Sequence, residues 1–545
     1  MEETVKIRYR DFLQRKASSL KPAARKVFLV ESDPDNRGKG DKDRAKDLGM
    51  TETAYTRQKT SMYQQLGFRA EGHKREDFLR QLEKEFSESP SEQEHKRAET
   101  AEKIAEIEVL LSRSQEMLFS HDQLKALLAS VKAGITLQEI EAPFGLQRRV
   151  VERLRQVLCQ VQECNRLHSL GCWGVSFSPD GQTIASGNLD GTVTIWSRDT
   201  KKPLTLQGHQ SRVWGVTFSP DGQMIASASK EGTVKLWNLN DKVPRTFEAH
   251  NDDVNSVSFS PDSQMIASAS RDGTVKLWNL NGTVRQIFQG QGHNASVDGV
   301  SFSPDGQIIA SASTDGTVKL WNVDGTVRQT LQEGHPEHLS WHNSVSFSPD
   351  GQMIASGSGK HSVKLWSRDG REVGTLQGHS DSVWDVSFSP DGQMLASASR
   401  DGTVKLWNLN EPGQLWNHDG RHMQTCRGHN HWVTGVSFSS DSQMLASAAS
   451  DGTVRLWSLD GTAKLYSFCG SKLDRGKRDW LASTIFSPEI QMFFPADQIR
   501  ISMLDSLELD DLVVCGCNWL HDYLKTNPYL SESDRHLCDG IGTQK

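Results

Sequence analysis

Between residues 163 and 458 the chain alternates short apolar runs with polar turns in a pattern that repeats. Runs such as VSFS, MIASAS and TVKLW are rich in Val, Ile, Phe and Trp, and Ser-Pro-Asp-Gly or Asp-Gly separates them. Short β-branched and aromatic runs bounded by turn residues are typical of strands in a meander. Turns this frequent leave no room for helices in this stretch.

The strand pattern recurs about every forty residues, which is the period of a four-stranded propeller blade. FSPDG or a close variant begins seven times, at Phe177, Phe218, Phe259, Phe302, Phe347, Phe388 and Phe438. One four-stranded sheet cannot cover both of its faces, whereas a ring of sheets covers each with its neighbours. The sequence therefore predicts an all-β propeller.

Each copy also carries polar and aromatic residues in a fixed register. Measured from a His, a Ser follows at +18, an Asp at +22 and a Trp at +28. With these residues the repeats resemble the WD40 family, and the resemblance implies a hydrogen-bonded tetrad inside each blade, which suits the donors and acceptors present. The sets are His168, Ser186, Asp190 and Trp196; His209, Ser227 and Trp237; His250, Ser268, Asp272 and Trp278; His293, Ser311, Asp315 and Trp321; His379, Ser397, Asp401 and Trp407; and His429, Ser447, Asp451 and Trp457.

Two copies depart from this register. In the second copy Glu231 stands in the Asp position, which puts its reach into the turn in doubt. In the fifth copy the register runs through His338, Ser356, Lys360 and Trp366. Because Lys cannot accept a hydrogen bond, we expect the fifth blade to be the weakest of the seven plain copies.

After Trp457 the segment 463–505 carries weaker traces of the repeat, including Phe486-Ser-Pro-Glu. Counting it, we expect seven clear blades plus a degenerate eighth, with seven as the alternative if this segment packs elsewhere. In the WD40 family a strand from one terminus completes the last blade, and residues 165–168 lie in the right place. The predicted propeller domain spans 163–505.

Both flanks of the propeller are predicted to be helical. In the C-terminal region 506–545, apolar residues at 509, 512, 513, 519, 520, 523 and 524 suit an amphipathic helix that ends before Asn527-Pro528 and packs on the propeller. Residues 91–162 read as long helices of a linker that feeds the first strand. These flanks resemble those of STAND NTPases and of cyanobacterial WD40 proteins, but no phosphate-binding GxxxxGK[ST] motif accompanies them.

The N-terminal region, 1–90, is predicted to be helical and carries a segment that resembles a helix-turn-helix. Residues 42–68 suggest two short helices around Leu48-Gly49-Met50, with Thr51 as the N-cap of the second and Gly67 just past its end. A DNA-binding helix needs a basic face. The window 40–60 holds five Lys or Arg against four Asp or Glu, which predicts weak phosphate contact.

Composition narrows the functional classes. A formal net charge of −7 over 545 residues gives no general attraction to nucleic acid or anionic membrane. No apolar run is long enough to span a membrane and no secretory signal opens the chain, so we expect a cytoplasmic protein. The eight cysteines lack zinc-ligand spacing and are interpreted as reduced thiols. We predict no metal and no cofactor.

His, Asp and Ser together also invite a catalytic interpretation. A hydrolytic triad is built once, around one activated nucleophile, whereas this set recurs at the same spacing in copy after copy. We therefore predict that the tetrads are structural and that the protein is not an enzyme.

By the WD40 resemblance, the exposed top-face positions lie just before the Asp of each copy and at the start of its innermost strand. The candidate partner-binding residues are Trp173, Arg212, Trp214, Lys230, Arg271, Trp341, Trp384, Arg400 and Trp432. Trp and Arg are enriched at binding hot spots, although packing between blades is the competing explanation for each Trp. A basic rim with aromatic residues would suit an acidic or phosphorylated segment.

Two functions follow from this sequence. The leading one is a non-catalytic scaffold or signalling sensor whose propeller binds a protein partner on its top face. The alternative is a transcription regulator that binds DNA through the helix-turn-helix-like segment and uses the propeller for signal input. A salt-dependent interaction with DNA would favour the second.

Overall fold

The structure is a computed structural model. It describes residues 3–18, 20, 22–32, 41–48, 50–65, 75–169, 171–197, 203–239, 244–288, 292–332, 341–409, 422–459, 507–527, 529–539 and 541. The chain divides into two compact units, Met1–Glu106 and Ile107–Lys545, and the boundary falls inside one long helix.

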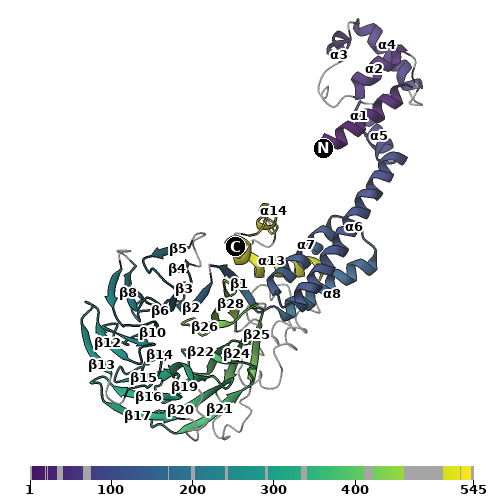
Figure 1. The fold of residues 1–545 in the computed structure, drawn as a ribbon. Coiled ribbons are helices and arrows are strands. Elements are labelled where there is room, and N and C mark those ends of the chain that lie inside the picture. The colour runs from purple at the N-terminus through teal and green to yellow at the C-terminus, as the bar shows by residue number, and fades with distance from the viewer. Residues whose placement is uncertain are drawn as a thin grey trace. The chain divides into compact units, whose positions relative to one another are not determined.

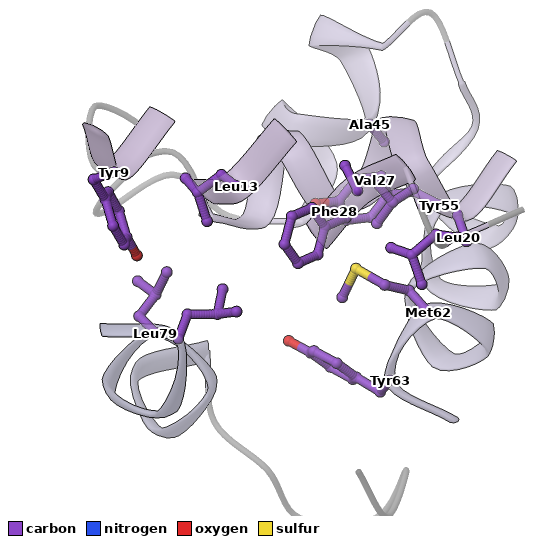
Figure 2. Close-up of a cluster of buried hydrophobic side chains, with 13 residues drawn as sticks. Tyr9, Leu13, Leu20, Val27, Phe28, Ala45, Tyr55, Met62, Tyr63 and Leu79 are labelled. Atoms are coloured by element: carbon purple, nitrogen blue, oxygen red, sulfur yellow. The ribbon is translucent and has the colours of Figure 1, made fainter. Parts of the chain in front are cut away.

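The first unit is helical, as predicted. Its helices are α1 (Glu3–Ser18), α2 (Pro22–Ser32), α3 (Asp41–Asp47), α4 (Glu52–Gln65), α5 (Arg75–Ser87) and the first part of α6 (Pro90–Phe119). Figure 2 shows their shared core, in which Phe28 of α2 lies between Leu13 of α1 and Tyr55 of α4. Burial of such aromatic and aliphatic side chains holds short helices that would not persist alone.

The second unit carries α7 (Gln123–Gln138), α8 (Phe144–Gln160), α13 (Leu509–Thr526) and α14 (Glu532–Arg535) beside the strands. The predicted C-terminal helix is therefore present, and it ends one residue before Asn527. It packs on α7, α8 and β1 (Glu163–His168), and the indole Nε1 of Trp519 donates to the carbonyl of Glu163 at 3.1 Å.

Twenty-eight strands form seven four-stranded antiparallel sheets in the described residues (Figure 1). Blade 1 comprises β2 (Cys172–Phe177), β3 (Thr183–Asn188), β4 (Thr192–Ser197) and β5 (Leu204–Gln207); blade 2 comprises β6 (Val213–Phe218), β7 (Met224–Ser229), β8 (Thr233–Asn238) and β9 (Arg245–Glu248). Blade 3 comprises β10 (Val254–Phe259), β11 (Met265–Ser270), β12 (Val275–Asn279) and β13 (Val284–Phe288); blade 4 comprises β14 (Val297–Phe302), β15 (Ile308–Ser313), β16 (Thr317–Asn322) and β17 (Val327–Gln332).

The remaining blades follow the same order. Blade 5 comprises β18 (His342–Phe347), β19 (Met353–Ser358), β20 (Ser362–Ser367) and β21 (Glu372–Gln377); blade 6 comprises β22 (Val383–Phe388), β23 (Met394–Ser399), β24 (Thr403–Asn408) and β25 (His422–Arg427). Blade 7 comprises β26 (Val433–Phe438), β27 (Met444–Ala449), β28 (Thr453–Ser458) and β1. The first strand of each blade in this listing, β2 through β26, is its inner strand.

The ring closes with seven blades, which corrects the expectation of an eighth. Strand β1 pairs antiparallel with β28, so the N-terminal side of the domain completes the last blade, as the resemblance implied. The inner strands β26 and β2 lie directly beside each other. A Cβ placed on Gly435 would stand 2.9 Å from the carbonyl of Trp173, so no sheet fits between these two strands. Segment 463–505 itself lies outside the described residues.

The propeller core lies between neighbouring blades. Leu236 and Phe247 of blade 2 pack with Phe259, Ile266 and Trp278 of blade 3 in one buried cluster, and equivalent clusters join the other pairs of blades. The period-two pattern of each strand supplies these side chains to both faces of every sheet. Each blade is therefore stable only against its neighbours.

A buried ionic network ties the closing strand to α7. The guanidinium of Arg166 donates to Glu163 at 2.8 Å through two nitrogens and to Asp122 at 2.8 Å. Arg455 of β28 donates to the same Glu163 carboxylate at 3.0 Å. A buried charge is tolerated only when it is paired, so these contacts specify the register of β1 against β28.

The cysteines differ from expectation at the C-terminus. Cys517 of α13 and Cys538 form a disulfide, with their Cα atoms 5.5 Å apart. Cys515 is also disulfide-bonded, so the interpretation of all eight cysteines as reduced thiols is wrong for these three. Cys164, Cys172 and Cys426 are buried free thiols. Sequence spacing alone did not indicate the pair because the turn after α13 brings the two together.

Candidate functional site

The predicted polar tetrad is assembled inside blade 3. His250 donates from Nδ1 to Asp272 at 3.0 Å and accepts at Nε2 from Ser268 at 2.7 Å, while Trp278 donates to the same Ser268 hydroxyl at 2.9 Å. Thr274 adds a bond to the carboxylate at 2.6 Å. Each member of the chain has a partner, which is the condition for a buried polar network to stabilise a fold.

Blades 4, 6 and 7 bring together their predicted residues in the same way. The His–Asp distances are 2.9 Å for His293–Asp315, 2.8 Å for His379–Asp401 and 3.1 Å for His429–Asp451. The His–Ser distances are 2.7 Å to Ser311, 2.8 Å to Ser397 and 2.7 Å to Ser447, and the indoles of Trp321, Trp407 and Trp457 close the chains.

The tetrad of blade 3 holds a neutral imidazole beside an ionised carboxylate. Burial would raise the pKa of Asp272, but hydrogen bonds from His250 and Thr274 outweigh it and hold that pKa far below its usual value. Burial lowers the pKa of His250 despite the neighbouring carboxylate. The hydroxyl of Ser268 is fully buried between the imidazole and the indole. A serine enclosed in this way is not exposed to solvent, which supports the interpretation of the tetrad as structural.

Blade 2 builds the tetrad with a glutamate. One carboxylate oxygen of Glu231 lies 2.6 Å from His209 Nδ1, and the other accepts from the backbone N–H of Gln210 at 2.7 Å. Ser227 lies 2.7 Å from the imidazole and accepts from Trp237 at 2.8 Å. The longer side chain therefore reaches the turn, and the doubt raised by this substitution is resolved.

Blade 1 does not bring its predicted His into the tetrad. His168 ends β1 opposite Thr453, with its ring edge-on to Tyr529 at 4.8 Å. The amide oxygen of Asn188 takes hydrogen bonds from the hydroxyls of Ser169 at 2.8 Å and Ser186 at 3.3 Å instead. Trp196 still donates to Ser186, at 3.2 Å, and Asp190 accepts from Thr192. The His differs because β1 belongs to the sheet of blade 7.

Blade 5 contains a histidine that the register did not single out. His342 opens the inner strand β18 where most blades have Val, and its side chain is fully buried. Its ring lies 6.3 Å from that of Trp366, a spacing close to those between His and Trp in the tetrads. Neither ring nitrogen has a hydrogen-bond partner in the described part of the chain. His338 lies outside the described residues.

The environment of His342 disfavours its protonated form. Burial, with the nearby charge of Lys364, lowers the pKa of His342 to about 4. The Ser356 hydroxyl accepts from the Trp366 indole at 2.9 Å, so of the tetrad's hydrogen bonds only the one between Ser and Trp is present in this blade. A comparison of the first residues of the inner strands could have found His342, because a His replaces an apolar residue there.

The top face is the end of the propeller where the inner strands begin. Four candidate residues gather there into a tryptophan cluster formed by Trp173, Trp214, Trp384 and Trp432. The ring of Trp173 lies edge-on to Trp214 at 4.6 Å and to Trp384 at 5.3 Å, and Trp384 stacks on Trp432 at 6.3 Å. All four rings are half-buried. The cluster joins blades 6, 7, 1 and 2, so it combines packing with an accessible aromatic surface.

Two predicted arginines flank the tryptophan cluster. The guanidinium of Arg400 lies 4.6 Å from the ring centre of Trp432, and that of Arg212 lies 5.8 Å from Trp214, both within the range of cation–π attraction. Arg400 also lies 3.8 Å from the carboxylate of Asp381. These two cations therefore already have partners on the rim.

The remaining three candidates lie apart from the tryptophan cluster. Lys230 and Arg271 are exposed on the turns of blades 2 and 3. Their backbone N–H groups donate to the backbone carbonyls of Arg212 and Asp253, respectively. Trp341 precedes β18 and leaves 53% of its surface exposed. The structure thus joins six of the nine candidates and leaves three as separate rim positions.

A carboxylate that the sequence did not single out, that of Asp385, directly follows Trp384 in β22. Burial raises the pKa of Asp385 to about 6, although its oxygens accept from the hydroxyl of Ser344 at 2.9 Å and from the backbone N–H of Val436 at 2.9 Å. These bonds join blades 5, 6 and 7. We assign Asp385 to the stability of the ring rather than to ligand binding.

The helix-turn-helix-like segment has the predicted helices α3 and α4, and Thr51 accepts from the backbone of Ala54 at 3.3 Å. Two of its cations are engaged internally: Arg44 is buried beside Glu31, and Lys59 contacts Asp41 at 2.9 Å. Charges held in this way are not available to phosphate, which weakens the case for DNA contact here.

Other classes of site have little support in the described part of the chain. No group of His, Cys, Asp or Glu there has the geometry to hold a metal ion. No helix among those residues is long and apolar enough to cross a membrane.

Two family models match the propeller part of the chain. The model described as WD domain, G-beta repeat, matches residues 161–197, 200–238 and 420–458. The model described as IFT122 first beta-propeller matches residues 240–415. No curated protein shows significant sequence similarity to the chain. The matches cover the stretch of the seven sheets and do not extend into the helical flanks, whose resemblance to STAND NTPases stays a prediction.

Proposed function

Because the chain belongs to the WD40-repeat β-propeller family, we propose that it is a non-catalytic scaffold or signalling sensor that binds a protein partner on its top face. Propellers of this family are generally protein-interaction scaffolds. The tryptophan cluster is the single observation that supports the site, because it concentrates half-buried indole rings beside Arg212 and Arg400. Large aromatic rings and guanidinium groups dominate binding energy at protein interfaces.

Affinity capture from the native cell's lysate tests this proposal. The bait is the full chain, compared with a Trp214→Ala, Arg271→Ala, Trp384→Ala variant that keeps its thermal unfolding transition. We expect at least one protein to be captured by the wild type and lost with the variant.

A matched control carries Arg285→Ala and Arg328→Ala, which lie on the outer strands β13 and β17. The control should capture the same protein as the wild type. If the wild type, the top-face variant and the control all capture the same proteins, binding on the top face is contradicted. The N-terminal helices would then be the next region to test for partner binding.

DNA binding by α4 remains the second candidate, without an observation in its favour. The buried contacts of Arg44 and Lys59 argue against it. Salt-dependent retention of a DNA fragment by the full chain, lost with Arg57→Ala on the exposed side of α4, would restore it.

A further inference from the structure

Neighbouring inner strands lie side by side around the ring, so their second residues gather about the propeller axis on the top face. This ring of positions is called the channel mouth below. In blades 1 to 7 these residues are Trp173, Trp214, Asn255, Asp298, Asn343, Trp384 and Thr434. The register of every inner strand against its neighbour shifts at this point, as in a β-bulge. Bulges redirect side chains and are frequent beside functional sites. The mouth thus has an aromatic arc and, in blades 3 to 5, a polar arc.

The polar arc presents mainly hydrogen-bond acceptors. The side-chain amide of Asn255 donates to the backbone carbonyl of Val297 at 3.2 Å and to Asp298 Oδ1 at 2.8 Å. Asn343 donates one of its two amide N–H groups to the carbonyl of Val383 at 2.8 Å. Because these partners can only accept, the orientation of both amides is determined by the network. The side-chain amide oxygens of Asn255 and Asn343 are therefore available to a ligand at the mouth.

Asp298 completes this acceptor arc of Asn255, Asp298 and Asn343. Its Oδ1 accepts from Asn255 and from Ser296, the latter at 2.6 Å. In the described part of the chain no hydrogen bond or ion pair involves its Oδ2 or either amide oxygen, and all three residues are half-buried. Burial raises the pKa of Asp298, whereas the hydrogen bonds from Ser296 and Asn255 and the charge of Arg271 favour its ionised form. The arc therefore offers three oxygens that have no donor partner, against one remaining N–H group, the second of Asn343.

The aromatic arc suits the same kind of group. Indole faces attract cations and pack against the methylene stem of a long basic side chain. The Nε1 atoms of Trp214 and Trp384 are enclosed without an acceptor, so an oxyanion cannot reach them while the tryptophan cluster keeps this packing. Arg212 lies over the ring of Trp214 and Arg400 over that of Trp432, so each of these two cations already has an aromatic partner.

We infer that the channel mouth binds a basic side chain, arginine or lysine, carried by an extended segment of the partner protein. The inference rests on the proposed function and specifies the chemistry of the partner. The cation would lie between Asp298 and the faces of Trp173, Trp214 and Trp384. The acidic or phosphorylated segment suggested by the rim alone is the competing ligand.

The test uses the full chain and four short peptides, acetyl-Gly-Gly-X-Gly-Gly-amide, with X as arginine, citrulline, glutamate or phosphoserine. Binding is titrated by ligand-observed NMR and by intrinsic Trp fluorescence. We expect the arginine peptide to bind about tenfold or more tightly than the citrulline peptide, which has the same shape and no charge. Equal binding of these two, tighter binding of either anionic peptide, or no binding of the arginine peptide would overturn the inference.

Variants locate the site. Asp298→Asn keeps an oxygen for Asn255 and Ser296 but removes the charge, and it should weaken the arginine peptide about tenfold. Asn343→Val should weaken it by a few-fold through the loss of one acceptor. Asp381→Asn makes the same charge change on the rim, beside Arg400, and should leave the affinity unchanged. Equal losses in Asp298→Asn and Asp381→Asn would indicate general electrostatics in place of a site.

The outcome is separable from that of the proposed function. If lysate capture depends on the top face but no arginine peptide binds, the basic side chain is wrong and the scaffold function stands. If the arginine peptide binds in a way that depends on Asp298, but the wild type and the top-face variant capture the same proteins from lysate, the scaffold function is wrong.

Discussion

Blades 3 and 5 have nearly the same strands but differ in their buried polar chemistry. Both contain Met-Ile-Ala-Ser and Val-Lys-Leu-Trp in paired strands, and in both a buried Ser accepts from the Trp indole. Blade 3 satisfies its histidine with Asp272 and Ser268, whereas blade 5 buries His342 with no partner for either nitrogen. The comparison teaches that the strands determine the sheet, while residues in turns and at strand ends determine whether its interior is satisfied.

The same substitution should have opposite effects in the two blades. His250→Val leaves Asp272 and Ser268 without their partner and should destabilise the protein by about 2–5 kcal/mol. His342→Val restores the residue that most other inner strands have and removes an unsatisfied buried group, which should stabilise by about 1–3 kcal/mol. The urea midpoint of unfolding, followed by Trp fluorescence, measures both. Destabilisation by both variants would show that His342 has a partner in the folded state.

Acid should destabilise the wild type partly through blade 5. His342 has a pKa of about 4 in the folded state against 6.5 for the free side chain, with Lys364, Lys360 and Asp315 as the charges that act on it. The unfolded chain therefore binds a proton that the folded chain resists, and stability falls as the pH drops from 6.5 to about 4.

This contribution amounts to about 3 kcal/mol at the end of that range. His342→Val should lose less stability between pH 7 and pH 4 than the wild type, measured by urea unfolding at each pH. Some acid sensitivity should remain, because burial also lowers the pKa values of His209, His250 and His429. Identical slopes for the two proteins would contradict the role of His342.

Replacing the buried serine of each blade with alanine should lower the free energy of unfolding by different amounts in blades 3 and 5, with a smaller difference than that expected for the histidines. Ser268→Ala deprives both His250 and Trp278 of a partner, whereas Ser356→Ala deprives only Trp366. With about 1–3 kcal/mol for each buried group left unsatisfied, the loss in blade 3 should exceed that in blade 5 by about 1–3 kcal/mol. Thermal and urea unfolding compare the two variants, and a larger loss in blade 5 would reverse the ranking.

The smallest effect is expected where the tetrad is already complete. Glu231→Asp in blade 2 exchanges one carboxylate for a shorter one that the other tetrads use, so stability should change by less than about 1 kcal/mol. Glu231→Gln is the matched control, because it keeps the length but removes the charge that His209 contacts. A large loss with Asp would show that blade 2 is shaped around the longer side chain.

Much of the architecture could be predicted from the sequence because it depends on local repetition. The turn chemistry of FSPDG and Asp-Gly and the period-two strands indicated a propeller, and the His, Asp, Ser and Trp register located four complete tetrads. The candidate site was located less well. Six of nine residues form one surface, while Asn255, Asp298 and Asn343 escaped notice because amides and a carboxylate at a strand start carry no motif.

The sequence by itself determined the strands, their turns, the helical flanks and which residues can form a tetrad, since each of these depends on neighbours within one repeat. Only the tertiary structure decided that seven blades close the ring, because closure depends on β1 pairing with β28 and β26 lying against β2. It also decided that His168 leaves its tetrad, that His342 is buried alone and that Cys517 meets Cys538. These outcomes join residues far apart in the chain, where spacing carries no information about contact.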